Sequence, residues 1–565
     1  MIGFMKKRAK IFENIIATAR MLLFIIQKKM QRIYKKPLPK IEGLRIEKDV
    51  HVKMRDGISL LVNIYLPDKV GKYPVIMCMT PYGKDEQPEH YDILKITGID
   101  VGDFKTSEYT IFEGPDPVFW VKRGYVVIHA NARGMWNSEG MAVIFDKQNG
   151  IDYYDLIEWA AAQEWSNGKV GLTGVSYLAW SQWMVAPLAP PHLAAICPWE
   201  AFSDMYREVA YHGGIREIGL MGQLSKRRFY AHYNRKYGIK EDLMTSIKQH
   251  PFFDSYWKDK NPDLSKINVP ALVCASWSDQ GLHTRGSLIG YSTINSKYKW
   301  LFTHGRKKWE TYYGNEALEM QTKFFDYFLK STNNTMLQQP KIRLEVRNSY
   351  YKAEVRYANE WPLANVAHKK LFLDASDHSM SLNLSKEENY IRYCGLNGKE
   401  SDSAVFNFKF SETMELTGGM RLKVWVSSES ETDFNLYVAV KKMDSAGNEV
   451  YFSGYNGNPF DMVAKGWLKV SHRETDEVLS TIEVPYHPHQ RKMPLDINQV
   501  VPVEVEILSS STLFEKGTLL QLVMMNREPI GYNTFKHEIL ESKGFFRIYS
   551  GGTYDSFLMI PEVNA

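Results

Sequence analysis

The sequence predicts an α/β domain followed by an all-β domain. Buried-strand runs alternate with helical patterns up to about residue 335, which is typical of a mostly parallel sheet covered on both faces. From about residue 369 onward, short alternating strands separated by turn residues indicate a β-sandwich. One apolar run, 170–175, ends in Gly174-Val175-Ser176 and passes directly into a helical pattern. Because the chemistry of such sheets lies at the carboxyl ends of the strands, this serine is the first candidate site.

Length and composition predict a folded protein of several domains. The chain has 565 residues, 44% of them hydrophobic, and a prior of about 150 residues per domain suggests two to four domains. The four cysteines are far apart and form no CxxC pair; they are Cys78, Cys197, Cys274 and Cys394. This pattern indicates buried thiols in a reducing compartment, and we therefore expect a cytoplasmic protein.

Residues 1–40 predict a basic amphipathic helix and a linker. They hold eleven Lys and Arg against Glu13 alone, or +10, whereas the whole chain carries +5. The remainder is thus mildly acidic, and we expect no nucleic-acid partner. The uncharged stretch Met21–Gln27 is too short to span a membrane, and Arg20 interrupts any secretory signal. Three roles stay open for residues 11–33: packing on the protein's own body, self-association in a homo-oligomer, and contact with an anionic membrane surface.

Residues 41–201 and 267–335 predict the α/β domain. An alternating pattern from Val50 to Leu66 around Asp56-Gly57 predicts a hairpin. Helical patterns lie at 151–162 and near 317–329. Buried strands are expected at 73–79, 125–130, 170–173, 193–197, 271–276 and 299–303.

Two further regions have a different character. Residues 202–266 are helical and rich in aromatic side chains, and they fall between two strands of the sheet, so we expect a cap over the active site. Residues 340–565 predict a linker strand and the β-sandwich, with strands at 370–373, 420–426, 434–441, 518–524 and 545–549.

Ser176 is the predicted nucleophile. A serine on a tight strand-to-helix turn adopts a strained backbone conformation that small neighbours permit, and its hydroxyl points toward the substrate. Gly174 is the small residue before it, but Leu178 stands two positions after it, where a second glycine is common. The pattern alone fits an ordinary turn equally well, so the other catalytic groups must decide.

A serine nucleophile needs a base and a carboxylate that orients the base. Asp279 follows the predicted strand 271–276, and His304 directly follows the next one. They come in the order Ser, Asp, His that this type of sheet uses. His283, four residues after Asp279, is the rival base.

The oxyanion of the reaction needs hydrogen-bond donors. The backbone N–H of Tyr177, directly after the nucleophile, is the expected first donor. Tyr82 lies where Thr80-Pro81-Tyr82-Gly83 breaks a strand abruptly, so its hydroxyl is the candidate second donor. A rim aromatic beside a turn is the alternative interpretation of Tyr82.

Several motifs together resemble the family of cocaine esterase, α-amino acid ester hydrolases and X-Pro dipeptidyl peptidases. The resemblance spans about residues 45–562 and implies an α/β-hydrolase domain with a helical cap, followed by a C-terminal jelly-roll β-sandwich. It also implies an acyl-enzyme on Ser176, a triad with Asp279 and a histidine, and an oxyanion hole of Tyr82 and the Tyr177 amide. The motifs are Thr80-Pro81-Tyr82-Gly83-Lys84, Asn131-Ala132-Arg133-Gly134, Ser138-Glu139-Gly140, the run from Trp165 to Gly171 with Gly174–Leu178, Trp277-Ser278-Asp279, Gly466-Trp467-Leu468 and Ile548–Gly552.

The chain departs from the family's pattern at three places. Asn131 replaces the frequent Asp before Arg-Gly, and Ala179 replaces a frequent Gly. The family's usual Gly-Pro-Trp-x-His around the catalytic histidine is absent, and 303–309 reads Thr-His-Gly-Arg-Lys-Lys-Trp instead. His304 is the only histidine at that strand end, so it remains the expected base.

The sequence therefore predicts a serine hydrolase that cleaves carboxylic esters or amides, most simply an acyl esterase, with no cofactor. X-Pro dipeptidyl-peptidase or α-amino acid ester hydrolase activity is the alternative, in which Glu200 and Asp204 bind the substrate ammonium; a helix N-terminus enriched in acids is the plainer interpretation of that pair. A catalytically silent binding or membrane-associated module stays open as a different class. No metal site is expected, since His487-Pro488-His489 has no further ligands nearby in the sequence.

Overall fold

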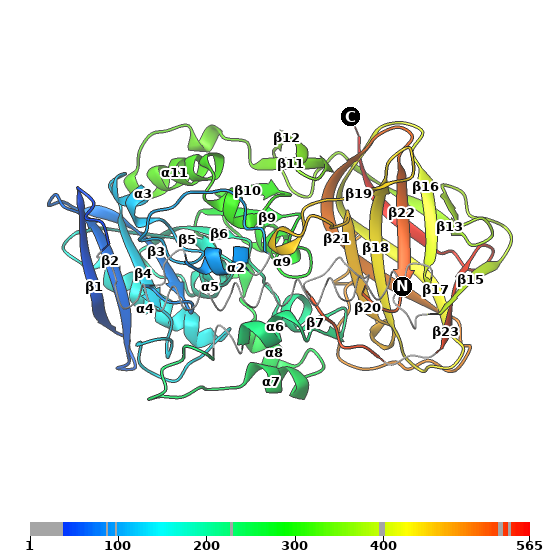
Figure 1. Cartoon of the computed structure of the whole chain (residues 1–565), viewed down its shortest axis with the longest axis horizontal. Helices are drawn as coiled ribbons and strands as arrows, with labels where there is room; N and C mark the ends of the chain where they lie inside the picture. The colour runs from blue at the N-terminus through cyan, green and yellow to red at the C-terminus, as the bar shows by residue number, and fades with distance from the viewer. Residues whose placement is uncertain are drawn as a thin grey trace.

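The computed structural model describes residues 38–85, 89–96, 99–225, 230–394, 402–528, 535–540 and 544–564. The amphipathic helix predicted within 1–40 lies outside these residues, apart from the last part of its linker. Among the described residues, none of the helices combines the length and the apolar character needed to cross a bilayer. The described chain forms an α/β unit and a strand-rich unit that lie side by side along the long axis (Figure 1).

The α/β unit is built on one twisted sheet. Its central strands, from β4 to β11, run parallel, and antiparallel strands close both edges. The order across the sheet is β1 (Leu44–Lys53), β2 (Ser59–Pro67), β4 (Val126–Asn131), β3 (Tyr73–Thr80), β5 (Ser166–Val175), β6 (Leu193–Trp199), β9 (Ala271–Ser276), β10 (Lys299–His304), β11 (Ile342–Ser349) and β12 (Lys352–Ala358). The predicted hairpin and all six predicted buried strands are present. The sheet also continues through β11 and β12, past residue 335 where the α/β domain was expected to end.

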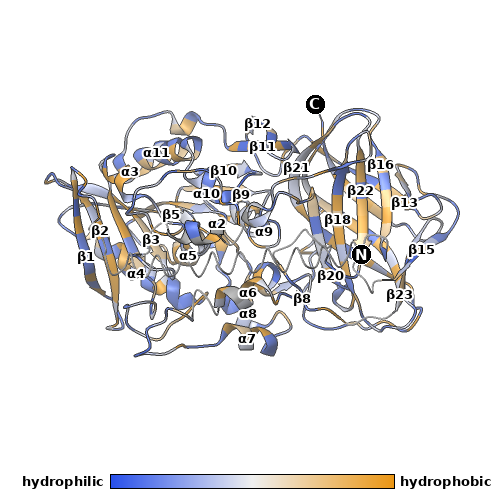
Figure 2. Cartoon of the chain, in the orientation of Figure 1, coloured by the Kyte–Doolittle hydropathy of each residue, from blue (hydrophilic) through white to orange (hydrophobic). Residues whose placement is uncertain are grey.

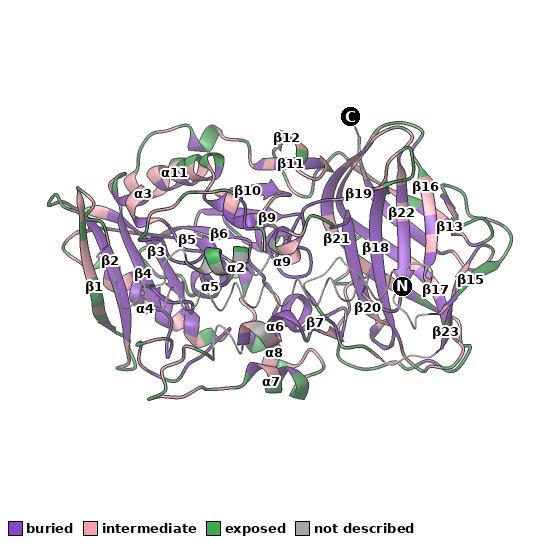
Figure 3. Ribbon diagram, viewed as in Figure 1, coloured by how far each residue is buried: buried purple, intermediate pink, exposed green. Residues whose placement is uncertain are grey.

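Helices cover both faces of this sheet, as its continuous apolar strands require. α3 (Pro117–Val121) and α11 (Asn315–Lys330) pack on one face, and α4 (Lys147–Ala161) and α9 (Thr284–Thr293) on the other. α5 (Tyr177–Val185) contributes side chains to both cores and is wholly buried. Purple strands in Figure 3 mark this buried layer. The remaining helices of the unit are α2 (Glu89–Ile96) and α10 (Lys308–Tyr312).

The chain between β6 and β9 forms a separate layer below the sheet in Figure 1. It contains a π-helical turn at Tyr206–Ala210, a short hairpin that the sequence pattern did not reveal, and several short helices. Aromatic stacking holds it together: Tyr206 stacks on Tyr211 at 4.9 Å and packs edge-on against Trp257 at 5.7 Å. Its elements are β7 (Tyr211–His212), β8 (Ile215–Arg216), α6 (Leu220–Leu224), α7 (Leu243–Gln249) and α8 (Ser255–Lys260).

The strand-rich unit follows the predicted change in pattern. Along β17 (Met414–Ser428), Met420, Leu422 and Val424 are buried and the residues between them are half-buried. Figure 2 shows hydrophobic and hydrophilic segments mixed along the strands of this unit. The longest strand after it, β21 (Val501–Phe514), was not predicted. The other strands are β13 (Val366–Asp374), β14 (Ser379–Ser381), β15 (Asn389–Cys394), β16 (Ala404–Lys409), β18 (Asn435–Met443), β19 (Glu449–Val450), β20 (Ala464–Lys469), β22 (Leu519–Met525), β23 (Phe545–Ser550) and β24 (Phe557–Val563).

Candidate active site

Ser176 lies on a strained turn between β5 and α5. Its φ of 60° and ψ of −115° are unfavourable for a residue with a side chain. Gly174, at φ +150°, has no room for a Cβ atom, because that atom would lie 2.6 Å from the Cβ of Leu178. The leucine that replaces the usual second glycine therefore packs against the first. The predicted nucleophile elbow is present.

His283, not His304, lies beside the nucleophile. Its Nε2 is 3.2 Å from the Ser176 Oγ, and its Nδ1 is 2.5 Å from the Asp279 Oδ2. An ionised carboxylate only accepts hydrogen bonds, so Nδ1 carries the hydrogen and Nε2 is left to accept the serine proton. The structure thus brings Ser176, Asp279 and a histidine together as predicted, and corrects which histidine it is.

The turn before α9 explains how residues only four apart meet. The His283 backbone N–H donates to the Asp279 carbonyl at 3.2 Å, and the Thr284 hydroxyl fixes the turn on the Ser276 carbonyl at 2.5 Å. Both side chains are then on the same side of one tight turn. His283 lies only four residues after Asp279, which makes it merely the rival base in the sequence, but across this turn the same spacing places its ring on the Asp279 carboxylate.

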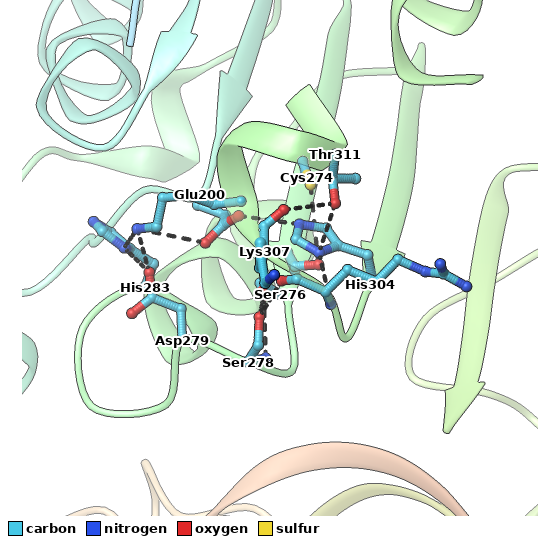
Figure 4. Close-up of polar contacts among 12 residues, drawn as sticks. Glu200, Cys274, Ser276, Ser278, Asp279, His283, His304, Lys307 and Thr311 are labelled. Atoms are coloured by element: carbon cyan, nitrogen blue, oxygen red, sulfur yellow. Dashed lines mark hydrogen bonds and ion pairs between the residues drawn. The ribbon is translucent and has the colours of Figure 1, made fainter. Parts of the chain in front are cut away.

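His304 is the last residue of β10, which lies between β9 and β11 in the sheet. Its Nε2 is 3.0 Å from the Glu200 Oε1, and its Nδ1 accepts the Arg306 backbone N–H at 3.3 Å. Glu200 lies between the two histidines in Figure 4. His304 is fully buried, and with both ring nitrogens engaged it has no place as the base for Ser176.

Lys308, which the sequence patterns did not reveal, is the second group that contacts the Asp279 carboxylate, after His283. Its Nζ lies 2.5 Å from Oδ2, the same oxygen that His283 contacts, and 3.3 Å from the His283 Nδ1. The Glu200 Oε2 lies 3.7 Å from the same Nζ. The first residue of α10 therefore places an ammonium group behind the triad.

The charges of this cluster reinforce one another. Burial favours the neutral form of Asp279, but Lys308 and His283 outweigh it and hold the pKa of this carboxyl well below its ordinary value. Burial likewise opposes the Lys308 ammonium, but Asp279 and Glu200 raise its pKa above the usual range. Burial lowers the pKa of His283; Asp279 opposes this and Lys308 adds to it. At neutral pH the cluster is a carboxylate, an ammonium and a neutral imidazole.

The same arrangement bears on metal binding. The ligand-type atoms of Glu200, Asp279 and His283 lie within 4.8 Å of one another. Lys308 already supplies a positive charge among them, so we interpret the group as acid–base machinery.

The histidines of His487-Pro488-His489 have other partners. The His487 ring nitrogens lie 2.9 Å and 3.0 Å from two backbone carbonyls, and His489 pairs with His472 at 3.1 Å.

The two predicted oxyanion residues flank the elbow. Tyr177 is the first residue of α5, where a backbone N–H has no acceptor within its own helix. Tyr82 follows β3, the strand beside β5, and its buried ring lies 6.4 Å from that of Tyr177. Both residues therefore lie at the carboxyl ends of neighbouring strands.

The two candidate ammonium-binding acids have other partners. Asp204 pairs with Arg207 at 2.7 Å and accepts the backbone N–H groups of Tyr206 and Arg207, which makes it a helix-start acid. Glu200 is fully buried with His304 and Lys308. Only Glu200 lies near the triad.

Glu113 is a second buried acid that the sequence did not reveal. Its backbone carbonyl accepts the Val175 N–H at 3.0 Å, one residue before the nucleophile, and its Oε1 accepts the Trp309 indole N–H at 3.2 Å. Burial raises the pKa of Glu113 to about 8, against the opposing influence of Lys308. This carboxyl is therefore mostly protonated at neutral pH.

The strand-rich unit contacts the catalytic turn directly. The Gln280 side chain donates to the Val463 carbonyl and accepts the Lys465 backbone N–H, both at 2.9 Å. Gln280 lies next to Asp279, so β20 and the residue before it hold the turn that carries two triad residues. Arg285 of α9 forms an ion pair with Glu506 of β21 at 3.0 Å, and a second one with Glu208 of the π-helical turn at 2.9 Å.

Two family models match successive parts of this chain. Residues 56–307 match the model of X-Pro dipeptidyl-peptidase (S15 family), and residues 333–559 match that of the X-Pro dipeptidyl-peptidase C-terminal non-catalytic domain. Cocaine esterase of Rhodococcus sp. (strain MB1 Bresler) is 25% identical over 74% of this chain and 71% of its own length. A putative Xaa-Pro dipeptidyl-peptidase of Bacillus anthracis is 23% identical over 61% of each chain.

A solved structure gives the firmest comparison. The crystal structure of a CocE/NonD family hydrolase from Staphylococcus aureus is 41% identical, covers 94% of this chain and 99% of its own, and superposes with a TM-score of 0.88. The agreement extends over both units and includes the strand-rich one. The nucleophile elbow and the hydrogen bonds from Ser176 through His283 to Asp279 agree with these relatives. The chain therefore belongs to the CocE/NonD family of hydrolases, and it is a serine hydrolase with an α/β-hydrolase fold and a C-terminal domain made mostly of strands.

Proposed function

We propose that this chain is an acyl esterase that forms an acyl-enzyme on Ser176. The observation that carries the proposal is the continuous set of hydrogen bonds from Ser176 through His283 to Asp279. A serine is a weak nucleophile unless such a base removes its proton, and the base must be oriented by a third group.

The reaction follows the roles that these atoms support. The His283 Nε2 takes the Ser176 proton while Oγ attacks the ester carbonyl, and Asp279 stabilises the imidazolium. Tyr82 and the Tyr177 amide donate to the oxyanion. His283 then returns its proton to the leaving alcohol, and a water molecule, deprotonated by the same ring, releases the acid.

Esters without a free amine are the favoured substrates. Recognition of a substrate ammonium needs a carboxylate that faces the substrate, whereas Asp204 is engaged with Arg207 and Glu200 with His304 and Lys308. Cleavage of aminoacyl substrates is the second candidate because the relatives include a putative Xaa-Pro dipeptidyl-peptidase, and Glu200 is the acid that would serve it.

In this proposal, residues 202–266 act as a cap and the strand-rich unit is a jelly roll. The support for the cap is contact with the catalytic turn: the Phe202 ring stacks on His283 at 6.2 Å, and Glu208 pairs with Arg285. The support for the jelly roll is the packing of two strand layers around one apolar core.

The test compares p-nitrophenyl acyl esters with aminoacyl-proline and amino-acid ester chromogens, for the wild type and Ser176→Ala. We expect simple esters to be cleaved and the mutant to be inactive. Preference for substrates with a free α-amine would move the assignment to the second candidate, with Glu200→Gln as the next variant. Failure of a fluorophosphonate probe to label Ser176 would contradict the enzyme proposal as a whole.

A further inference from the structure

We propose that Lys308 is a positioning residue of the triad, which holds the Asp279 carboxylate in place and sets the pH range over which His283 is a competent base. The inference rests on the proposed function, since it concerns the same base. It starts from the fact that one oxygen, Asp279 Oδ2, receives both the His283 Nδ1 and the Lys308 Nζ at 2.5 Å.

The geometry makes Lys308 a partner of the carboxylate and not of the imidazole. The His283 Nδ1 and the Lys308 Nζ are 3.3 Å apart, but both carry hydrogens directed at Oδ2, so no hydrogen bond joins them. The two groups interact only electrostatically. An ammonium at this distance in a buried site disfavours a second positive charge on the ring.

Lys308 is held where it is by the fold. The loop before it is fixed because the Ser278 hydroxyl donates to the Arg306 carbonyl at 2.6 Å, and the Trp277 N–H to the His304 carbonyl at 2.7 Å. The Lys308 side chain is only 6% exposed, and its Nζ lies 5.2 Å from the centre of the Tyr455 ring. A buried ammonium that is tied to two carboxylates stays protonated, so Lys308 does not act as the base itself.

The other charged groups around His283 do not provide this effect. Asp279 and Glu200 both favour the imidazolium, because each raises the pKa of His283. Glu113 faces Lys308 and is mostly neutral. Arg285, two residues along α9, is neutralised by Glu208 and Glu506. Among the described residues that face the ring, Lys308 is the cation that opposes its protonation.

The wild-type enzyme gives the first test, which needs no variant. Lys308 and burial together should place the acid limb of kcat/KM for a p-nitrophenyl ester below the ordinary histidine value of about 6.5. A limb at or above that value would overturn the proposal. If the wild type shows no turnover and no fluorophosphonate labelling, it is the proposed function that fails instead.

Substitution gives the second test. Lys308→Met removes the charge, and Lys308→Gln removes it but keeps a hydrogen-bond donor for Asp279. We expect both to move the acid limb upward by about one pH unit, with the larger loss of kcat in Lys308→Met. Lys308→Arg, which keeps the charge, should retain the wild-type limb. An equal loss of activity at every pH in Lys308→Gln would show a merely structural role and overturn the proposal.

Discussion

Gly174 and Leu178 pack against each other so closely at the nucleophile elbow that a Cβ atom on the glycine would lie 2.6 Å from the Cβ of the leucine. The same atom would lie 3.3 Å from the Glu113 carbonyl oxygen. We expect Gly174→Ala to displace Ser176 and to lower kcat by about 10²-fold, since small displacements of a catalytic group have such effects. Leu178→Gly removes the opposing Cβ atom, so the double variant should recover part of the activity in the ester assay. No recovery would mean that the backbone conformation, and not the contact, is decisive.

Substitution of each histidine in turn separates the role of His283 from that of His304. We expect His283→Ala to lower kcat by about 10³-fold or more and to abolish fluorophosphonate labelling. His304→Gln should keep kcat within about tenfold, because the glutamine amide can donate to Glu200 and only packing is changed. Thermal unfolding of both variants provides the control. If His304→Gln loses activity as completely as His283→Ala while remaining folded, the assignment of the base is wrong.

The hydroxyl of Tyr82 is expected to act only in the transition state. Removing one oxyanion donor costs about 10²–10³ in kcat with little change in KM, and we expect Tyr82→Phe to show this. Tyr109→Phe is the matched control, because Tyr109 is equally buried and its hydroxyl donates to the Pro39 carbonyl at 2.8 Å. A raised KM with unchanged kcat in Tyr82→Phe would instead mark a rim residue that only contacts substrate.

Glu113 should make the folded state less stable as the pH rises. Its pKa is raised from 4.5 to about 8 on folding, so between these values the unfolded chain releases a proton that the folded chain retains. Unfolding is therefore favoured progressively with rising pH across this window. We expect Glu113→Gln, which can still accept the Trp309 N–H, to raise Tm relative to the wild type more at pH 8 than at pH 4.5. The same Tm difference at both pH values would contradict a protonated Glu113.

The side chain of Gln280 should matter for turnover more than for folding. We expect Gln280→Ala to lower kcat by about tenfold or more through displacement of the turn that carries Asp279 and His283. Lys465→Ala is the control, because it removes the Lys465 side chain but keeps the backbone N–H that donates to Gln280. Urea unfolding measures the effect of each variant on folding, and ester turnover measures its effect on kcat, so the two assays show whether these effects separate. Wild-type kcat in Gln280→Ala would show that the turn holds itself.

Sequence patterns predicted the layers of the fold and, within the candidate site, that Ser176 and Asp279 lie together with a histidine. Periodicity located the parallel strands because each is buried along its whole length, and Gly174-Val175-Ser176 located the elbow because its backbone requires a small residue. His304 was predicted to lie beside Ser176, but His283 lies there and His304 pairs with Glu200, because strand-end position does not tell whether a ring has a buried partner. Lys308 and Glu113 could not be predicted, because Lys308 contacts Asp279, and Glu113 contacts Val175 beside the nucleophile, only through long-range packing.

The Gln280 hydrogen bonds also affect how the protein can be divided. Asp279 and His283 belong to one turn, and Gln280 lies between them. The Gln280 side chain is hydrogen-bonded to the backbone at Val463 and Lys465, almost two hundred positions downstream. A nascent chain cannot form these two Gln280 hydrogen bonds until that later part has emerged and folded. Truncation after the α/β sheet, or exchange of the C-terminal unit with that of a relative, would remove or alter the strand that pairs with Gln280, so we expect either change to lower ester turnover.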